Sequence, residues 1–278
     1  MKKKCLIYVV CYNHEKFILK TLNRIPINLS NSYEIEVLVA NDKSKDNTLQ
    51  ETKKFKTNNF KYNIISLYKN LGYGGNQKIG YYYSILNNFD YVVLLHGDGQ
   101  YAPEYLPNIL NEFELEDNYS AIFGSRMIEK GSALRGGMPL YKFFGNKFLT
   151  KVQNFLLNSN LSEFHSGYRA YRVESLKKIF FQKNSNDYCF DTEIIIQLLL
   201  NKFKIKEISI PTFYGDEISY VNGFKYAAQI IFETIIANLH KNKILKNEKL
   251  ELVEKFNKNN LNSNIESIIN NSEFYKIN

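Results

Sequence analysis

The stretch Tyr91–Gln100, which reads YVVLLHGDGQ, joins a run of apolar residues to a short polar motif. A run of β-branched and aliphatic residues that ends at glycine is typical of a buried strand. In open α/β sheets, ligands bind just beyond the carboxyl ends of the strands. Glycine on either side of Asp98 lets the backbone turn tightly and lets a ligand approach closely. We therefore expect a strand over 91–95 whose functional groups follow it directly.

Three different polar groups follow this strand at alternate positions, on His96, Asp98 and Gln100. Carboxylate and amide oxygens suit a hard divalent cation, which usually also binds substrate phosphates. The motif therefore predicts a Mg²⁺ or Mn²⁺ site, with His96 as a further ligand. The alternative is that Asp98 only caps the helix expected after Pro103. The motif alone leaves both interpretations open.

The composition indicates a folded protein whose partner carries phosphate. Of the 278 residues, 44% are hydrophobic and 15% are aromatic, which excludes a largely disordered chain. The net charge of +8 favours a nucleotide, a lipid head group or nucleic acid as partner, and does not choose among them. Cys5, Cys11 and Cys189 form no C-x-x-C pair, which indicates reduced, buried thiols in a cytosolic protein. No apolar run approaches the roughly 18 residues of a membrane-spanning helix.

Strand-like and helix-like segments alternate along most of the chain. We expect strands at residues 6–10, 34–40, 63–67, 91–95, 121–124 and 205–210. We expect helices at residues 15–24, 45–55, 75–88, 103–113, 139–157 and 191–202. This alternation predicts an α/β fold, with a mostly parallel central sheet and helices on both faces.

The C-terminal part of the chain has a different character. Residues 223–239 are apolar at helical spacing, which predicts an amphipathic helix on the sheet or on a membrane surface. From residue 240 onward Lys, Asn and Glu predominate. This composition predicts a mobile or loosely helical tail outside the core.

Polar clusters also follow the first two predicted strands. Residues 12–15 follow the first strand and residues 41–48 follow the second. In the second cluster, Ser44 or Asp46 could cap the next helix, whereas Asp42 is left to accept hydrogen bonds from a base or a ribose.

A glycine-rich turn, with Gly72, Gly74 and Gly75, follows the third predicted strand. Such a turn at the start of a helix can present backbone N–H groups to a phosphate. Its spacing fits neither a Walker loop nor the dinucleotide fingerprint. Because the carboxyl ends of parallel strands meet at one edge of a sheet, we expect this turn, the two clusters and the Asp98 motif to lie together.

These motifs, in this order, resemble those of glycosyltransferase family 2. The matching residues are Tyr12-Asn13, Asn41-Asp42 with Ser44 and Asp46, Asn70 with Gly72-Tyr73-Gly74-Gly75, Asp98-Gly99-Gln100, Gly124-Ser125-Arg126, Met138-Pro139-Leu140-Tyr141 with Gly145-Asn146, Ser166-Gly167-Tyr168-Arg169-Ala170-Tyr171 and Phe190-Asp191-Thr192-Glu193. Within the family, the set is most similar to dolichyl- and polyprenyl-phosphate mannosyl- and glucosyltransferases. The resemblance runs from about residue 6 to about residue 223.

The resemblance implies a GT-A fold, with a single Rossmann-like domain and a C-terminal helical extension. It implies a glycosyltransferase domain at 1–222, divided into a nucleotide-sugar half (about 1–125) and an acceptor half (about 126–222), with the amphipathic helix and polar tail at 223–278. It also implies a nucleoside-diphosphate sugar donor, Mg²⁺ or Mn²⁺ as cofactor, and inversion at the anomeric carbon. The residues then expected to bind the nucleotide sugar are Tyr12, Asn13, Glu15, Asn41, Asp42, Gly72, Gly74, Gly75, His96, Gly97 and Asp98.

The same resemblance assigns the acceptor site and the catalytic residues. The acceptor-binding residues are Arg126, Lys142, Ser166 and Arg169, and the catalytic residues are Asp98, Asp191, Glu193, Arg126 and Arg169. A lipid phosphate is already a nucleophile at neutral pH, whereas a sugar hydroxyl requires a carboxylate base. Asp191 and Glu193 are best placed as that base, and Glu163 is another candidate. The simpler alternatives are a helix N-cap for Asp191 and a structural ion pair of Arg169 with Glu163 or Asp191.

The chain departs from the family pattern at several positions. His96 stands where the family has the first Asp of its metal-binding motif, and Asn41 stands where an Asp is expected. Imidazole can ligate Mn²⁺ but ligates Mg²⁺ poorly. Three roles therefore stay open for His96: it binds the metal, it contacts the diphosphate directly, or it is a neutral neighbour. Residues 214–219 resemble a family loop but lack its Ser-Lys pair.

Together these observations predict an inverting, metal-dependent transfer of a hexose from a nucleoside-diphosphate sugar to polyprenyl phosphate. We expect a cytoplasmic protein with peripheral contact at the inner face of the cytoplasmic membrane, and no nucleic-acid partner. Three alternatives remain at this point. They are transfer to a sugar hydroxyl of a surface polysaccharide or glycolipid, a nucleotidyltransferase, and a non-catalytic sugar-nucleotide-binding module.

Overall fold

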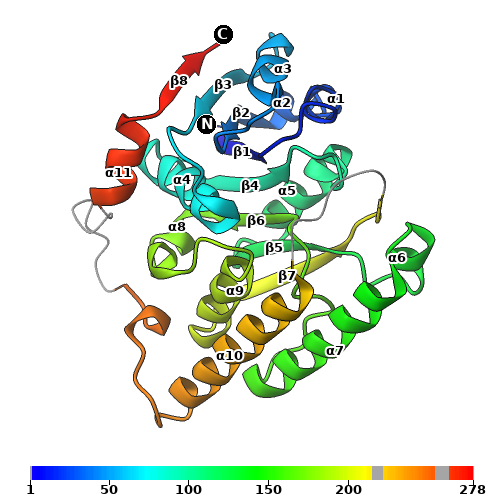
Figure 1. Cartoon of the computed structure of the whole chain (residues 1–278), viewed down its shortest axis with the longest axis vertical. Coiled ribbons are helices and arrows are strands. Elements are labelled where there is room, and N and C mark those ends of the chain that lie inside the picture. The colour runs from blue at the N-terminus through cyan, green and yellow to red at the C-terminus, as the bar shows by residue number, and fades with distance from the viewer. Residues whose placement is uncertain (1, 215–221, 254–262, 278) are drawn as a thin grey trace.

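The computed structural model describes residues 2–214, 222–253 and 263–277, and one eight-stranded sheet runs through them (Figure 1). Along the sheet the strand order is β7-β5-β6-β4-β1-β2-β3-β8. The strands are β1 (Lys3–Cys11), β2 (Tyr33–Asn41), β3 (Lys61–Ser66), β4 (Tyr91–His96), β5 (Tyr119–Ser125), β6 (Arg169–Arg172), β7 (Lys204–Ser209) and β8 (Glu273–Lys276). Only β6 and β8 run antiparallel to their neighbours among these strands. The predicted α/β fold with a mostly parallel sheet is confirmed.

Helices cover both faces of the sheet (Figure 1). They are α1 (Ile18–Asn23), α2 (Leu29–Ser32), α3 (Thr48–Lys54), α4 (Gly72–Leu86), α5 (Leu106–Leu115), α6 (Ser132–Arg135), α7 (Leu140–Leu157), α8 (Val173–Leu176), α9 (Phe190–Leu200), α10 (Gly223–Lys241) and α11 (Ser263–Asn270). Single 3-10 turns are η1 (Pro103–Tyr105), η2 (Phe181–Lys183) and η3 (Glu248–Leu250). Within the described residues, no helix is both long enough and apolar enough to span a bilayer.

The central strands are apolar throughout because each face of the sheet carries its own core. In β1, Leu6 and Tyr8 belong to one core, whereas Cys5 and Ile7 belong to the other. Successive residues of a strand point to opposite faces, so a strand buried on both sides is a continuous apolar run. The apolar run that forms β4 is continuous for the same reason, because its residues also alternate between the two cores.

The register of the parallel strands brings their carboxyl ends to one edge. Cys11 of β1 pairs with Asn41 of β2, and Asn41 pairs with Ser66 of β3. On the other side of β1, Val10 pairs with His96 of β4. The four segments that follow these strands therefore lie side by side, as expected.

The sequence does not predict β6. Its two arginines make the segment Arg169–Arg172 polar, yet it inserts antiparallel between β4 and β5. The strand tolerates Arg169 because the guanidinium donates to protein carbonyls instead of water.

The expectation of a tail outside the core is wrong for the described part of that tail. Ile265 and Ile268 of α11 are 5% and 7% exposed and join the core that contains α4. β8 then extends the sheet by pairing with β3. These few apolar residues stand among many Lys, Asn and Glu residues, so the average composition conceals them. The domain boundary at residue 222 stays a prediction.

Replacing Ile268 with alanine should lower the free energy of unfolding by about 2–4 kcal/mol, because it leaves a cavity against α4. Asn270→Ala, at an exposed position of the same helix, should change it by less than about 0.5 kcal/mol. Urea unfolding followed by circular dichroism measures both values. Equal midpoints for the two variants would contradict the packing of α11 described above.

Candidate active site

Hydrogen bonds between backbone and side chains join the loops that follow β1 and β2. Asn13 Oδ1 accepts a hydrogen bond from Lys45 N at 2.8 Å, and Glu15 Oε2 accepts one from Asn47 N at 2.9 Å. Asn13 has a φ of 56°, a left-handed conformation in which asparagine is enriched. Asn13 and Glu15, both expected at the nucleotide site, therefore hold the two loops in shape. Tyr12, which is partly buried, begins the first loop.

Asn41 and Asp42 are buried where β2 ends. Asn41 accepts a hydrogen bond from Ser44 N at 3.2 Å and donates one to Ser66 Oγ at 3.1 Å. Asp42 Oδ1 accepts a hydrogen bond from Leu71 N at 2.8 Å, so its carboxylate fixes the start of the glycine turn. Burial raises the pKa of Asp42 to about 6.

The glycine turn forms the first turn of α4 and packs against the segment before α9. Gly74 N and Gly75 N both donate to Asn186 O, at 2.9 and 3.2 Å. A Cβ on Gly72 would lie 2.6 Å from the same oxygen, and φ there is +76°, so this position requires glycine. The expectation that these amides face a phosphate is corrected, because a protein carbonyl already accepts the amides of Gly74 and Gly75.

A chain of hydrogen bonds joins His96, at the end of β4, to Asp191 in the first turn of α9. Tyr73 Oη donates to Asp191 Oδ2 at 2.9 Å and lies 3.1 Å from His96 Nε2. Gln77, one turn further along α4, donates to Asp191 Oδ1 at 3.0 Å. Burial lowers the pKa of His96 and raises that of Tyr73, so the imidazole is neutral and the phenol keeps its proton. Since Tyr73 donates to Asp191, His96 donates to Tyr73.

Arg169 supports Asp191 from β6. It donates to the carbonyl oxygens of Phe164, Ser166 and Asp191, each at 2.7 Å, and its Nη2 lies 3.7 Å from Asp191 Oδ2. The structural ion pair considered for Arg169 therefore exists, with Asp191 and not with Glu163. The side chain is 1% exposed. The guanidinium is enclosed by these protein groups, and its assignment to acceptor binding stays a prediction.

Ser166 and Gly167 pack against the end of β4. Ser166 is buried, and Gly167 N donates to Tyr101 Oη at 2.7 Å. A Cβ on Gly167 would lie 2.7 Å from the His96 ring, so only glycine permits this approach.

Glu193, the second expected base, belongs to a separate network. Its Oε1 lies 2.8 Å from Lys249 Nζ, and its Oε2 accepts hydrogen bonds from Ser185 N and Oγ at 2.7 and 2.6 Å. These contacts use both carboxylate oxygens away from Asp191 and its partners, and the catalytic assignment of Glu193 stays a prediction. Through Ser185, Glu193 also fixes the neighbouring Asn186 that receives the glycine turn.

The N-cap alternative for Asp191 is also wrong. Cys189 occupies the N-cap position of α9, and Asp191 lies within the helix. The Asp191 carboxylate is directed to Tyr73 and Gln77 instead. Asp191 therefore keeps its place at the centre of the candidate site.

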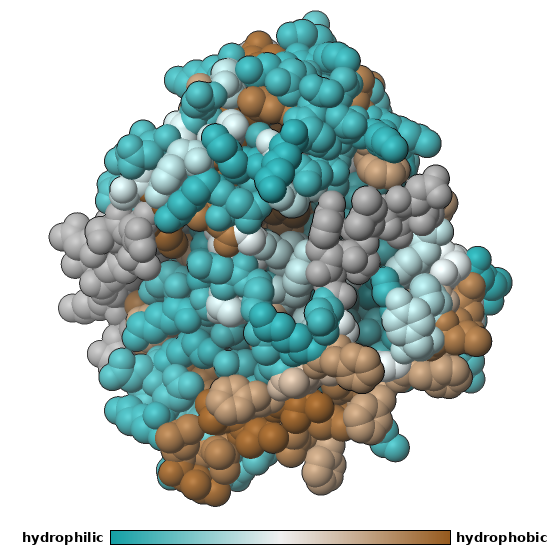
Figure 2. All heavy atoms as spheres, viewed as in Figure 1, coloured by the Kyte–Doolittle hydropathy of each residue, from teal (hydrophilic) through white to brown (hydrophobic). Residues whose placement is uncertain are grey.

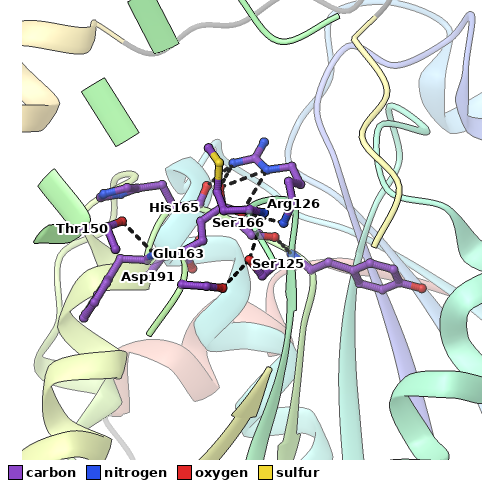
Figure 3. A network of polar contacts seen from close by, with 12 residues as sticks. Ser125, Arg126, Thr150, Glu163, His165, Ser166 and Asp191 are labelled. Atoms are coloured by element: carbon purple, nitrogen blue, oxygen red, sulfur yellow. Dashed lines mark hydrogen bonds and ion pairs between the residues drawn. The ribbon is translucent and has the colours of Figure 1, made fainter. Parts of the chain in front are cut away.

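Arg126 forms a buried ion pair with Glu163 (Figure 3). Its Nε donates to Glu163 Oε1 at 3.0 Å, its Nη1 to Tyr214 Oη at 3.0 Å and its Nη2 to His165 O at 3.0 Å. This guanidinium is thus held by protein groups, which differs from the expected contact with an acceptor. Lys142 Nζ lies 5.2 Å from the centre of the Tyr214 ring, on the same side of the molecule. Residues 215–219 of the loop that resembles the family lie outside the described residues.

The groups after β4 fit a divalent cation in combination with a diphosphate. Asp98 is partly exposed, and its Oδ1 accepts a hydrogen bond from Gln100 N at 3.0 Å. In the described part of the chain, no three His, Cys, Asp or Glu side chains are grouped so that they could hold a metal. A Mg²⁺ ion often takes one or two carboxylates and completes its shell with substrate phosphates and water, so Asp98 with Gln100 beside it fits such an ion. His96 uses Nε2 for Tyr73, so Nδ1 is the ring nitrogen that could ligate a metal.

Several residues of this site were not expected from the sequence. Tyr73 and Gln77 lie four residues apart on α4 and therefore on one face of the helix. Their spacing, directly after the glycine turn, was a signal that could have identified them. Asn186 and Lys249 carry no local signal, because their roles depend on contacts with distant parts of the chain.

The sheet topology, with a strand-end carboxylate flanked by glycines, is that of the GT-A fold. The sequence model of glycosyl transferase family 2 matches residues 6–180, and the chain belongs to this family. Family membership decides against the nucleotidyltransferase and against the non-catalytic binding module.

Known relatives of the chain are also named as glycosyltransferases. A UDP-N-acetylglucosamine–dolichyl-phosphate N-acetylglucosaminyltransferase of Methanococcus voltae is 30% identical over 225 residues, which cover 76% of this chain and 87% of the relative. An undecaprenyl-phosphate mannosyltransferase of Micrococcus luteus is 24% identical over 218 residues, which cover 77% of this chain and 85% of the relative. The fold is similar to that of glucosyl-3-phosphoglycerate synthase of Mycobacterium tuberculosis in complex with Mn²⁺, UDP and glucosyl-3-phosphoglycerate. That match has a TM-score of 0.59 at 13% identity and covers 88% of this chain and 81% of the other.

Replacing Lys249 with methionine should lower the free energy of unfolding by about 3 kcal/mol, because it leaves the buried Glu193 carboxylate without its cation. The matched control is Lys183→Met, which breaks an exposed pair with Glu248 nearby and should cost less than about 1 kcal/mol. Chemical denaturation of both variants measures the difference. An equal loss in the two variants would argue against a buried pair at Glu193.

The stability of the protein should depend on the ionisation of Asp42. Its pKa rises from 3.8 to about 6 in the folded state, so folding favours the protonated form. The contribution of Asp42 is therefore fully present below about pH 4 and is lost as the pH rises through about 6. Asp42→Asn should remove this loss, worth at most about 3 kcal/mol at pH 7 relative to pH 4. Unfolding measured across this range checks the effect, and parallel curves for the two proteins would rule it out.

Proposed function

We propose that this glycosyltransferase transfers a hexose, with inversion at the anomeric carbon, from a nucleoside-diphosphate sugar to a polyprenyl phosphate. The observation that carries the choice of acceptor is the state of the candidate bases. Glu193 is paired with Lys249, and Glu163 is paired with Arg126. Both oxygens of the remaining candidate, Asp191, accept hydrogen bonds from side chains of α4.

A phosphate acceptor needs none of these carboxylates as a base. Its oxygen is already ionised at neutral pH, whereas a hydroxyl has to lose a proton during the attack. The names of two relatives support the same choice, because the Methanococcus voltae enzyme is named for dolichyl phosphate and the Micrococcus luteus enzyme for undecaprenyl phosphate.

We assign the donor to the edge where β1, β2 and β4 end. Tyr12 and Asp42 would bind the base and ribose, and His96, Gly97 and Asp98 would face the diphosphate. The other residues expected at the nucleotide site hold the surrounding loops in shape, as their contacts indicate. These residues are Asn13, Glu15, Asn41, Gly72, Gly74 and Gly75.

Asp98 and Gln100, with His96 Nδ1 as a further ligand, would hold Mg²⁺ or Mn²⁺ on the diphosphate. Such a cation acts as a Lewis acid that stabilises the charge gathered by the leaving nucleoside diphosphate. The Mn²⁺ and UDP in the Mycobacterium tuberculosis enzyme of the same fold support this assignment.

Asp191 would stabilise the sugar as it becomes positively charged. Transfer passes through an oxocarbenium-like state, which a nearby carboxylate favours. Tyr73, Gln77 and Arg169 hold this carboxylate in one orientation, so little reorganisation is needed during the reaction. Arg169 is thus a positioning residue.

The acceptor would approach from the side of Arg126, Lys142 and Ser166. Arg126 contributes positive charge to that side even though Glu163 holds it in place. We place the reaction at the cytoplasmic face of the cytoplasmic membrane, with the protein bound peripherally.

The direct test is incubation with labelled nucleoside-diphosphate hexoses, polyprenyl phosphate and Mn²⁺. We expect a labelled lipid and release of a nucleoside diphosphate. Asp98→Asn should lower the rate by about 100-fold or more, because the cation on the diphosphate loses its carboxylate ligand from the protein. Glu193→Gln should remain within about tenfold of the wild type, since we place this residue outside the chemistry.

Two outcomes would overturn the proposal. One is label transferred only to a sugar hydroxyl, together with an inactive Asp191→Asn variant, which would identify Asp191 as a general base. The other is an Asp98→Asn variant as active as the wild type.

A further inference from the structure

Helix α7 exposes a row of large apolar side chains. Leu140, Phe144 and Phe148 are each 63% exposed, Tyr141 is 74% exposed and Phe155 is 85% exposed. At 3.6 residues per turn, these five residues lie within about 100° of the helix circumference. The opposite side of the helix packs on the protein through Leu149, Thr150, Gln153 and Leu157. Helix α7 is therefore apolar on a side that no described part of the chain covers.

Helix α10 repeats this arrangement. Phe224 is 94% exposed, Phe232 is 61% exposed and Ile235 is 44% exposed. These three residues also lie within about 100° of each other around the helix. The buried side consists of Ile230, Thr234 and Ala237.

The two helices run side by side and present these rows together. Asn238 Nδ2 donates to Leu156 O at 2.6 Å, and Lys241 Nζ donates to Leu157 O at 3.2 Å. Figure 2 shows a brown apolar band at the bottom of the molecule, where Figure 1 places α10 and α7. We call it the α7–α10 face, and its members are Leu140, Tyr141, Phe144, Phe148, Phe155, Phe224, Phe232 and Ile235.

We propose that the α7–α10 face binds the surface of an anionic lipid bilayer. Lysines accompany the apolar residues on both helices, at Lys142, Lys147, Lys151, Lys225 and Lys241. The only acidic residue of the two helices is Glu233, and it is held by Lys249. Helices with apolar side chains on one face and lysines beside them lie in the interface of membranes that contain anionic lipids.

A second copy of the chain fits this face less well. A symmetric dimer brings the same patch of both copies together, so the lysines of one copy would face those of the other. Anionic head groups instead complement this charge, while the phenylalanines enter the acyl boundary.

Both helices also reach the acceptor side of the candidate site. Lys142 of α7 lies near Tyr214, which binds Arg126. On α10, the Tyr226 Oη atom lies 3.1 Å from His165 Nδ1. A lipid-linked phosphate in the bound bilayer would therefore approach the site from this face, a point that rests on the proposed function.

Flotation of the full chain with phospholipid vesicles tests the proposal. The wild type should float with vesicles of phosphatidylcholine and phosphatidylglycerol, and bind at least about tenfold more weakly to phosphatidylcholine alone. The double variant Phe155→Ser/Phe224→Ser should bind the anionic vesicles at least about tenfold more weakly than the wild type. Both side chains are largely exposed, so the variant should fold normally, which circular dichroism checks.

The matched control is Ile27→Ser/Leu115→Ser, which removes two apolar side chains that are 61% and 70% exposed outside the α7–α10 face. It should bind vesicles like the wild type. Absence of wild-type flotation, equal binding to both vesicle types, or equal behaviour of the two double variants would overturn the proposal. A dimer in solution that Phe155→Ser/Phe224→Ser dissociates, without any flotation, would assign the face to a second copy and also overturn it.

A measurement without vesicles separates this proposal from the proposed function. The Phe155→Ser/Phe224→Ser variant should hydrolyse the soluble donor at the wild-type rate, because neither residue lies at the donor edge. A wild type that floats as expected but neither hydrolyses nor transfers the sugar would contradict the proposed function and support the α7–α10 face.

Discussion

The buried carboxylate of Asp191 is the interaction on which the arrangement of this site depends. It receives hydrogen bonds from Tyr73 and Gln77 of α4 and lies beside Arg169 of β6. Through Tyr73 it is also linked to His96 of β4. One side chain thus connects a helix and two strands that are far apart in the sequence. A polar group buried to this degree is stable only when its partners are present, so these elements adopt a single relative position.

Hydrophobic pattern was sufficient to predict most of the sheet. β1 to β4 are buried on both faces, and such strands give apolar runs that are recognised without knowledge of their partners. β6 and β8 were not predicted, because Arg169 and Glu273 interrupt the pattern there. Both strands are defined by the neighbours they pair with. Their formation is a property of the assembled sheet more than of the local sequence.

The sequence located the edge that carries the site but not the orientation of each side chain. Asp191 and Glu193 are two residues apart on a helix, so they differ by about 200° in direction and cannot share one partner. The choice between them required the position of α4. Likewise, the motif that contains Arg126 could not reveal that Glu163 already balances its charge, because 37 residues separate the two. Long-range pairing of charges is the information that local motifs do not contain.

The contacts of η3 have a consequence for the order in which the protein matures. Lys249 holds Glu193, which fixes the segment that receives the glycine turn, and Gln197 Nε2 donates to Lys249 O at 2.8 Å. Residues 248–250 are synthesised after the whole sheet from β1 to β7. During translation, strands β1 to β7 can therefore assemble before the donor edge is in its final form. A nascent chain that already contains strands β1 to β7 would therefore lack this support for the glycine turn until the short segment leaves the ribosome.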